Sequence, residues 1–322
     1  MHRGNIVATG KPAAVINQDM LETVYGIRAR VSIDEKGLPQ IIPISSVRSN
    51  GTGNKRGNMQ ETKEVMEEFA SDPVKRGVKE YWDYGSKFYD AAPGLGKEDE
   101  RRLWKEVLAK TIGDAPQHVL DVGTGTGFIA LLLAELGHQV TGVDFSAKML
   151  EVARQKTAEF LKTLKILEGD VERLPFDDHS FDGVTARYIL WTLPDPEKAI
   201  REWIRLLKPG GGLVIIDGLW ETKGILQHIC KFNLKMYRLL KFGKRPFTNR
   251  YKKDLSLQLP HPTGVKMEEI KRYMINAGLT DISVTDLEKV RKAQRKHLPW
   301  YLKCAYDYPT YLLMGKASES SI

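Results

Sequence analysis

Apolar residues in the middle of the chain gather in short runs that alternate with amphipathic segments. This alternation predicts an α/β fold in which parallel strands are joined by helices. The predicted strands are residues 119–121, 138–143, 165–170, the first part of 180–191, and 213–217. The predicted helices between them are residues 128–134 and 195–208, the second with Pro196 in its first turn and Pro209–Gly212 at its end.

Weaker patterns predict further elements on both sides of this alternation. Before the first strand, a helix is expected to begin near Lys97. Near the C-terminus, the pattern predicts a helix followed by two strands that form an antiparallel hairpin. These elements are a helix over 266–278 that ends in glycine, strands over 282–285 and 309–316, and a hairpin loop at 298–308 that would line a substrate pocket or cover the sheet edge.

One turn in this pattern carries the clearest functional signal. The first strand leads into Gly123, Gly125 and Gly127, and glycine lets bare backbone approach a ligand because it has no Cβ. In the dinucleotide-binding fingerprint the third glycine follows the second by three positions, whereas here it follows by two. The compressed spacing therefore favours a single nucleoside over a dinucleotide.

Acidic residues end the strands around this turn. Asp121 comes just before the glycines, where a carboxylate suits an ammonium group better than a pyrophosphate. Asp144 ends the next strand, at the distance where an acid meets ribose hydroxyls in such folds. Asp170 ends the third strand and can accept a hydrogen bond from an adenine amino group. An acid for an amine and an acid for a ribose together describe S-adenosyl-L-methionine (SAM).

These motifs, in this order, resemble those of class I SAM-dependent methyltransferases, in the small-molecule branch that includes the ubiquinone/menaquinone C-methyltransferases. The resemblance spans about residues 60–316. It implies SAM as cofactor and a Rossmann-like α/β fold: a seven-stranded, mostly parallel sheet with a C-terminal antiparallel hairpin and a helical cap. The residues that carry it are 119–127, 143–144, 169–171 with 174–176, 181–182 and 207–211.

The resemblance also implies a set of cofactor-binding residues. The methionine end of the cofactor would lie against Asp121 and the backbone of the glycine turn, and the ribose against Asp144. The adenine would lie between Asp170, Val171 and Met149. An arginine would line the site near the sulfonium through its backbone, and tyrosines of the segment before the core would close over it. In chain order these residues are Tyr81, Tyr84 (or Tyr89), Asp121, Gly123, Gly125, Gly127, Asp144, Met149, Asp170, Val171 and Arg187. The alternative for the methionine and the tyrosines is simple packing of helices on the sheet.

The N-terminal part of the chain does not fit this pattern. Residues 6–43 resemble the C-terminal tail of ATP-binding subunits of iron-siderophore and cobalamin importers, although no Gly-x-x-x-x-Gly-Lys-Ser/Thr motif is present. The expected organisation is a tail-like fragment at 1–45, a polar and glycine-rich linker at 46–58, a methyltransferase domain at 59–316 with a cap insertion at about 219–264, and a disordered tail at 317–322. The fragment is interpreted as a gene remnant or, alternatively, as a docking segment.

Basic residues are concentrated after the fifth strand. Residues 223–303 contain roughly nineteen lysines and arginines but only six aspartates and glutamates, within a chain of net charge +8. Residues 231–242 mix cationic and apolar positions at helical spacing, and 244–253 form a basic stretch. This charge suits an anionic small-molecule acceptor, but a solvated basic face, contact with nucleic acid and contact with an anionic membrane are all left open. If a general base is needed, the candidates are His261, Tyr188 and His228, each with a structural role as the alternative.

Composition limits the remaining possibilities. The two cysteines, Cys230 and Cys304, exclude a disulfide framework and a cysteine-rich metal site, so no metal is expected and both are interpreted as small buried side chains. No run of eighteen apolar residues and no signal peptide is found, which predicts a cytoplasmic protein without a transmembrane segment. The sequence thus favours methylation of a small molecule, either an anionic compound or a metal-chelating metabolite. The alternatives are an RNA methyltransferase and a non-catalytic SAM-binding protein associated with a metal or cobalamin importer. It leaves the acceptor atom and the oligomeric state open.

Overall fold

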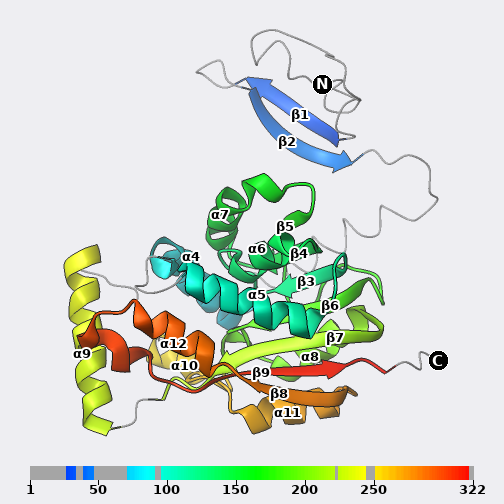
Figure 1. Ribbon diagram of the computed structural model, residues 1–322. Coiled ribbons are helices and arrows are strands. Elements are labelled where there is room, and N and C mark those ends of the chain that lie inside the picture. Colours follow the sequence, from blue (N-terminus) through cyan, green and yellow to red (C-terminus); the bar gives the residue numbers. More distant parts are fainter. Residues whose placement is uncertain are drawn as a thin grey trace. The chain divides into compact units, whose positions relative to one another are not determined.

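The computed structural model describes residues 27–33, 39–46, 71–90, 96–221, 224–243 and 251–318. By its contacts the chain divides into two compact units, residues 1–57 and residues 58–322. In the first unit, β1 (Ile27–Ile33) and β2 (Pro39–Ser46) pair in antiparallel fashion (Figure 1). Most of the predicted linker at 46–58 lies outside the described residues, as do parts of the importer-like segment.

The second unit is built on one seven-stranded sheet (Figure 1). Only β9 runs against its neighbours, because it pairs in antiparallel fashion with both β7 and β8, whereas the other adjacent pairs are parallel. The prediction of a mostly parallel sheet with an antiparallel end is therefore confirmed. In spatial order the strands are β5 (Leu164–Glu168), β4 (Gln139–Asp144), β3 (His118–Val122), β6 (Phe181–Arg187), β7 (Leu207–Gly218), β9 (Thr310–Lys316) and β8 (Thr280–Asp286).

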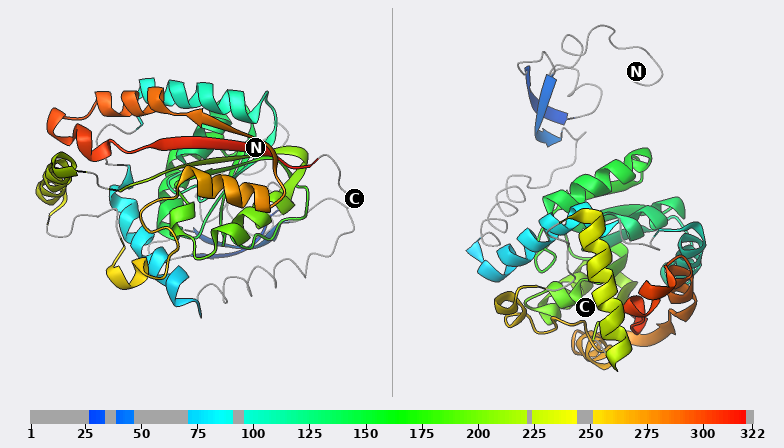
Figure 2. Two further views of the ribbon diagram at one scale, coloured as in Figure 1. Left: turned by 90° about the horizontal axis from the view of Figure 1, so that it is seen from below. Right: turned by 90° about the vertical axis from the view of Figure 1, so that its left-hand side faces the viewer.

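Helices cover both faces of the sheet, as the alternating side chains of β7 require. Leu213 and Ile215 belong to an apolar cluster with α8 (Pro196–Leu206) and α11 (Met267–Asn276). Val214 and Ile216 belong to a second cluster on the opposite face. That cluster also takes in α5 (Glu98–Ile112), α6 (Phe128–Glu135) and Leu287 and Val290 at the start of α12 (Glu288–Lys296). Both faces are visible in Figures 1 and 2.

The end of α8 differs from the prediction. Asp195 caps the helix by accepting a hydrogen bond from the amide of Lys198, with Pro196 in the first turn, as expected. The helix nevertheless ends at Leu206 rather than Lys208, and β7 begins at once. The reason is that Leu207 pairs with Phe181 of β6, so the glycine-rich residues after it form an irregularity inside the strand rather than a turn before it.

The C-terminal part contains more helix than the sequence indicates. Between β8 and β9 the chain forms α12 and a 3-10 helix, η3 (Trp300–Tyr306), where only a hairpin loop was expected. The predicted disordered tail is wrong at its first residue, because Ala317 is buried and its amide donates to the carbonyl of Gly211. Residues 319–322 lie outside the described residues.

The insertion after β7 forms the cap. An antiparallel bridge joins Leu219 to Gly264. The insertion carries α9 (Gly224–Phe242) and the short α10 (Lys253–Ser256), while residues 244–250 lie outside the described part. Within the described residues, no helix is long and apolar enough to cross a membrane.

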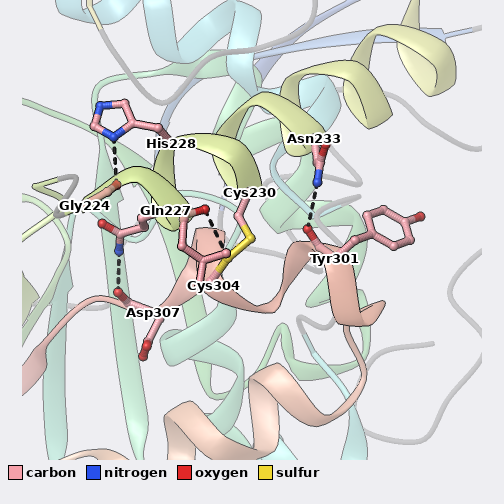
Figure 3. Close-up of a disulfide and its surroundings, with 9 residues drawn as sticks. Gly224, Gln227, His228, Cys230, Asn233, Tyr301, Cys304 and Asp307 are labelled. Atoms are coloured by element: carbon pink, nitrogen blue, oxygen red, sulfur yellow. Dashed lines mark hydrogen bonds between the residues drawn. A yellow bond between two sulfur atoms is a disulfide. The ribbon is translucent and has the colours of Figure 1, made fainter.

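The two cysteines correct the sequence interpretation. Cys230 of α9 and Cys304 of η3 form a disulfide across 74 positions of the chain, with their Cα atoms 5.8 Å apart (Figure 3). They are therefore not two separate buried thiols. The bond ties the cap helix to the segment that precedes the last strand.

Candidate functional site

The turn between β3 and α6 holds three glycines in the left-handed region of backbone conformation. Gly123, Gly125 and Gly127 have φ values of +64°, +55° and +78°. A Cβ added to Gly123 would lie 2.2 Å from Cδ1 of Ile189, which is far inside van der Waals contact. The backbone can pass this close to Ile189 because Gly123 has no side chain.

Asp121 lies under this turn and is held by two hydroxyl groups. The side chains of Thr124 and Thr185 donate to its two carboxylate oxygens at 2.7 and 2.8 Å. Burial raises the pKa of Asp121, and the two hydrogen bonds and the charge of Arg187 oppose that rise. The acid is therefore a buried electrostatic feature beneath the glycines.

Asp144, at the end of β4, is bound to the same turn. The amide of Gly125 donates to one carboxylate oxygen at 2.9 Å, and the amide of Ser146 donates to the other at 2.8 Å. Burial raises the pKa of Asp144 to about 6 in spite of these bonds, and the nearby Asp121 and Asp83 add to the rise. A carboxylate in this position gains from any ligand that brings further hydrogen-bond donors.

A cavity lies beside the glycine turn. Its walls come from the ends of β3, β4 and β6, from α7 (Ala147–Lys156) and from α4 (Pro73–Tyr89), the helix before the core. Most of its lining is apolar or aromatic. The lining residues are Trp82, Tyr89, Gly123, Gly125, Asp144, Phe145, Met149, Arg187, Tyr188, Ile189 and Thr192.

Arg187 lies between this cavity and a second one of about 340 Å³. Its guanidinium carbon lies 4.8 Å from the ring centre of Phe128 and 5.1 Å from that of Tyr188, which are cation–π distances. Among the described residues no carboxylate forms an ion pair with it. The side chain, and not only the backbone expected from the sequence, therefore faces the site.

The second cavity shares Tyr89 and Arg187 with the first and extends toward α5. Its other charged groups are already engaged: Arg101 contacts Glu135, and Lys156 lies 3.0 Å from Asp90. Apolar atoms of Phe128 and Leu131 complete its wall. Arg187 is thus the cation of this cavity that remains available to an anionic or polarised ligand.

Helix α4 is fixed over the cavity by polar contacts along its length. At its start, Lys75 Nζ lies 2.6 Å from both Asp170 and Glu172. In its middle, the hydroxyl of Ser146, next to Asp144, donates to Asp83 at 2.6 Å. Just after its end, Asp90 accepts from the hydroxyl of Thr126 in the glycine turn, at 2.8 Å. The helix therefore contacts every predicted cofactor-binding segment up to Asp170.

Some of the predicted cofactor residues do not line the cavity. Tyr81 packs on Trp82 and Tyr251, and Tyr84 is 40% exposed and packs on Phe88. Asp170 and Val171 are buried next to α4, where the carboxylate already pairs with the lysine. Gly127 caps α6 behind the turn. Of the tyrosines considered on α4, the structure brings Tyr89 to the cavity.

The three candidate bases lie in different parts of the protein. Tyr188 lines the cavity, but burial raises its pKa to about 12, so the phenol keeps its proton at neutral pH. His261 lies in the cap, with Nε2 2.8 Å from the hydroxyl of Tyr273. His228 is exposed on α9, with Nδ1 2.9 Å from the carbonyl of Gly224. Neither histidine lines the two cavities.

Four lining residues were not among the sequence-based candidates: Trp82, Phe145, Ile189 and Thr192. Trp82 belongs to the aromatic run at 81–89, so the segment was visible although the ring was not. Phe145 follows Asp144 directly and could have been inferred from that position. Ile189 and Thr192 lie at the two ends of a 3-10 helix after β6, η2 (Leu190–Thr192), which is too short to produce a periodic pattern in the sequence.

Comparisons with known proteins agree with this geometry. Residues 120–215 match the family model described as a methyltransferase domain. A demethylmenaquinone methyltransferase of Staphylococcus aureus is 32% identical over 203 residues, which covers 62% of this chain and 83% of that protein. None of these matches concerns an importer subunit, so the resemblance of residues 6–43 stays a prediction.

Solved structures show the same fold. Phosphoethanolamine N-methyltransferase 2 of Haemonchus contortus, in complex with SAM, superposes with a TM-score of 0.52 at 18% identity and covers 87% of this chain and 64% of that one. A methyltransferase of Haloferax volcanii, in complex with the activator Trm112, has a TM-score of 0.51 at 20% identity and covers 76% and 99%. At these identities the similarity is one of fold.

Proposed function

Because the chain belongs to the class I SAM-dependent methyltransferases, we propose that it methylates a quinol-type aromatic small molecule bound beside Arg187. Its cofactor is SAM. The acceptor is suggested by the Staphylococcus aureus relative, whose name gives demethylmenaquinone as its substrate. The observation that carries the proposal is the guanidinium of Arg187, which pairs with no carboxylate of the described residues and lies near two aromatic rings at the junction of two cavities.

The residues around the first cavity suit SAM. The glycine turn brings backbone without side chains to the wall of the cavity at Gly123 and Gly125. Asp144 presents a buried carboxylate that can accept from ribose hydroxyls, and Asp121 supplies negative charge beneath the turn for a cationic ligand. Rings of Trp82 and Tyr89 close the cavity from α4 and exclude water.

Bound SAM supplies a methyl group on a sulfonium, whose sulfur leaves with the bonding electron pair. The protein has to hold an acceptor carbon in line with that methyl group. A quinol becomes nucleophilic at its ring carbon when its hydroxyl loses a proton, and Arg187 would stabilise the phenolate. The ring carbon would form the new bond to the methyl group as the sulfur leaves with the electron pair, and would then lose its proton to solvent. Tyr188, which stays protonated, would donate a hydrogen bond rather than act as the base.

The test is transfer of radiolabelled methyl from SAM to a water-soluble 1,4-naphthoquinol, with binding of S-adenosylhomocysteine measured in parallel. Arg187→Gln should lower kcat on the order of a hundredfold, as expected for the loss of one charge stabiliser, with cofactor affinity little changed. Arg187→Lys should recover part of the rate. The matched control is Arg201→Gln, which removes an exposed arginine paired with Glu197 on α8.

Two results would overturn the proposal. One is a protein that binds S-adenosylhomocysteine but leaves the naphthoquinol unmethylated from neutral to alkaline pH, while another acceptor class is methylated. The other is an Arg187→Gln variant that binds S-adenosylhomocysteine more weakly but keeps the wild-type kcat. The guanidinium would then bind the carboxylate of the cofactor.

A further inference from the structure

Helix α9 exposes a stripe of large apolar side chains. Ile225, Ile229, Phe232, Met236 and Leu240 recur at spacings of three and four, so they lie on one side of the helix. They are among the exposed large hydrophobic residues of the protein, with Ile225 and Leu240 each 82% and Phe232 62% exposed. An ordinary protein surface exposes large apolar side chains singly, whereas these five side chains form a continuous row along the helix.

The opposite side of α9 is fixed, so the stripe points away from the protein. Cys230 and Leu234 are buried against η3, and the disulfide to Cys304 crosses this contact (Figure 3). The side-chain amide of Gln227 donates to the carbonyl of Asp307 at 2.8 Å. Figure 2 shows α9 alongside the C-terminal segment that contains η3. Among the residues that the structure describes, packing on η3 therefore determines which face of α9 is left exposed.

The surroundings of the stripe are cationic. The helix has no aspartate or glutamate and carries Lys231, Lys235, Arg238 and Lys241. Beside it, on η3, Trp300 is 83% exposed. A helix with an apolar stripe on one side and only cationic charges on its other sides is typical of segments that lie in the interface of a bilayer.

A basic hollow of about 340 Å³ lies next to this helix, between α12 and η3. Cys304 of the disulfide forms part of its wall, which places the hollow directly beside α9. Lys303 makes no ion pair with any described residue, whereas Arg295 contacts Asp307 and Lys296 lies 3.4 Å from Asp99. The hollow is lined by Lys292, Arg295, Lys296, Lys303, Cys304 and Asp307.

We propose that the face formed by α9 and η3 docks the protein on an anionic membrane surface. The five side chains of the stripe enter the apolar boundary together with Trp300, and the hollow beside Lys303 receives a lipid phosphate. A second copy of the chain is a poorer occupant, because a two-fold contact through this stripe would bring the lysines and arginine of two helices together. An anionic bilayer offers an apolar interior to the stripe and negatively charged headgroups to the lysines and arginines.

This surface is connected to the catalytic cavity by aromatic contacts. Lys231 Nζ donates to the carbonyl of Trp220 at 3.1 Å. The Trp220 ring packs on Tyr188, which lines the cavity, with 5.2 Å between ring centres, and on Tyr308 at 4.9 Å. Docking would thus place the cap that borders the cavity at the membrane. The inference does not depend on the identity of the acceptor, since it concerns binding and not turnover.

The test is co-sedimentation of the full chain with vesicles, without any acceptor. Vesicles containing phosphatidylglycerol should retain the protein, and those of phosphatidylcholine alone should retain it about tenfold more weakly, with binding reduced by salt. The double change Phe232→Ser and Leu240→Ser should lower retention about tenfold or more, and Lys303→Glu should lower it on phosphatidylglycerol only. All variants should bind S-adenosylhomocysteine like the wild type, which shows that they are folded.

The matched control changes Leu161 and Leu257 to serine, because these leucines are 74% and 76% exposed but belong to other segments, just before β5 and just after α10. The control variant should be retained like the wild type. The proposal is overturned if the wild type binds neither vesicle, or if both double variants behave alike. It is equally overturned if ultracentrifugation shows a dimer that the stripe variant abolishes, or if the basic face retains RNA instead of vesicles.

Discussion

Acidification should weaken cofactor binding because Asp144 is buried at the point where ribose hydroxyls would be bound. Burial raises the pKa of this carboxyl to about 6 in the protein without cofactor. A cofactor that requires the ionised carboxylate must then compete with a proton, and one pH unit below the pKa corresponds to a tenfold loss. The dissociation constant of S-adenosylhomocysteine should therefore rise about tenfold from pH 7 to pH 5.

The same group should affect the stability of the protein without cofactor in the opposite direction. Since the pKa of Asp144 is raised from 3.8 to about 6 on folding, the folded state binds more protons than the unfolded state within that window. Its contribution therefore destabilises the fold above pH 6 and is relieved as the pH falls toward 4. The whole difference amounts to about 3 kcal/mol. Stability and cofactor affinity should thus change with opposite signs.

The assay is quenching of tryptophan fluorescence by S-adenosylhomocysteine between pH 5 and 8, since Trp82 lines the cavity. Urea unfolding at the same pH values gives the stability. Asp144→Asn is the control, because it keeps the shape and removes the titration, so its affinity should be weak and nearly independent of pH. An affinity of the wild type that stays constant from pH 7 to pH 5 would refute the role given to Asp144.

Three further changes test separate parts of the structure. Gly123→Ala should abolish S-adenosylhomocysteine binding in calorimetry, because the new Cβ would lie 2.2 Å from Ile189 Cδ1 and the residue has φ +64°; unchanged affinity would mean that the turn is not the cofactor contact. Replacing Cys230 and Cys304 by serine should lower the free energy of unfolding in urea by about 4 kcal/mol, because the bond closes a loop across 74 positions; equal stability with and without the bond would argue against it. Lys75→Met should cost about 3 kcal/mol in the same assay, because it leaves the nearly buried Asp170 and Glu172 without their cation, and a neutral outcome would show that α4 does not depend on this contact.

The parts of the fold that could be predicted are those in which local pattern and tertiary environment agree. Residues 213–217 read as a buried strand because both faces of β7 are covered by helices. Helix α12 was missed because only Val290 and Ala293 are buried in it, and charged residues occupy most other positions. The first half of β7 was missed because its strand geometry comes from pairing with β6 and not from its own residues.

The candidate site shows the same division. Asp121, Asp144 and the glycine turn could be located from the sequence because parallel strands bring their carboxyl ends to one edge. The sequence could not show which ring of α4 faces the cavity, because Tyr81 and Tyr89 lie on one helix and differ in their tertiary contacts: Tyr81 packs on Tyr251, whereas Tyr89 lines the cavity. The pairing of cysteines 74 positions apart is likewise a property of the tertiary fold.

The contacts of α4 bear on how a cofactor enters. Lys75, Asp83 and Asp90 reach Asp170, Ser146 and Thr126 in turn, so this one helix covers the adenine, ribose and methionine ends of the expected site. The rings of Trp82 and Tyr89, which line the cavity, lie on the same helix. We therefore expect α4 to cover a bound cofactor and exclude water, so that cofactor entry and release depend on the motion of this helix.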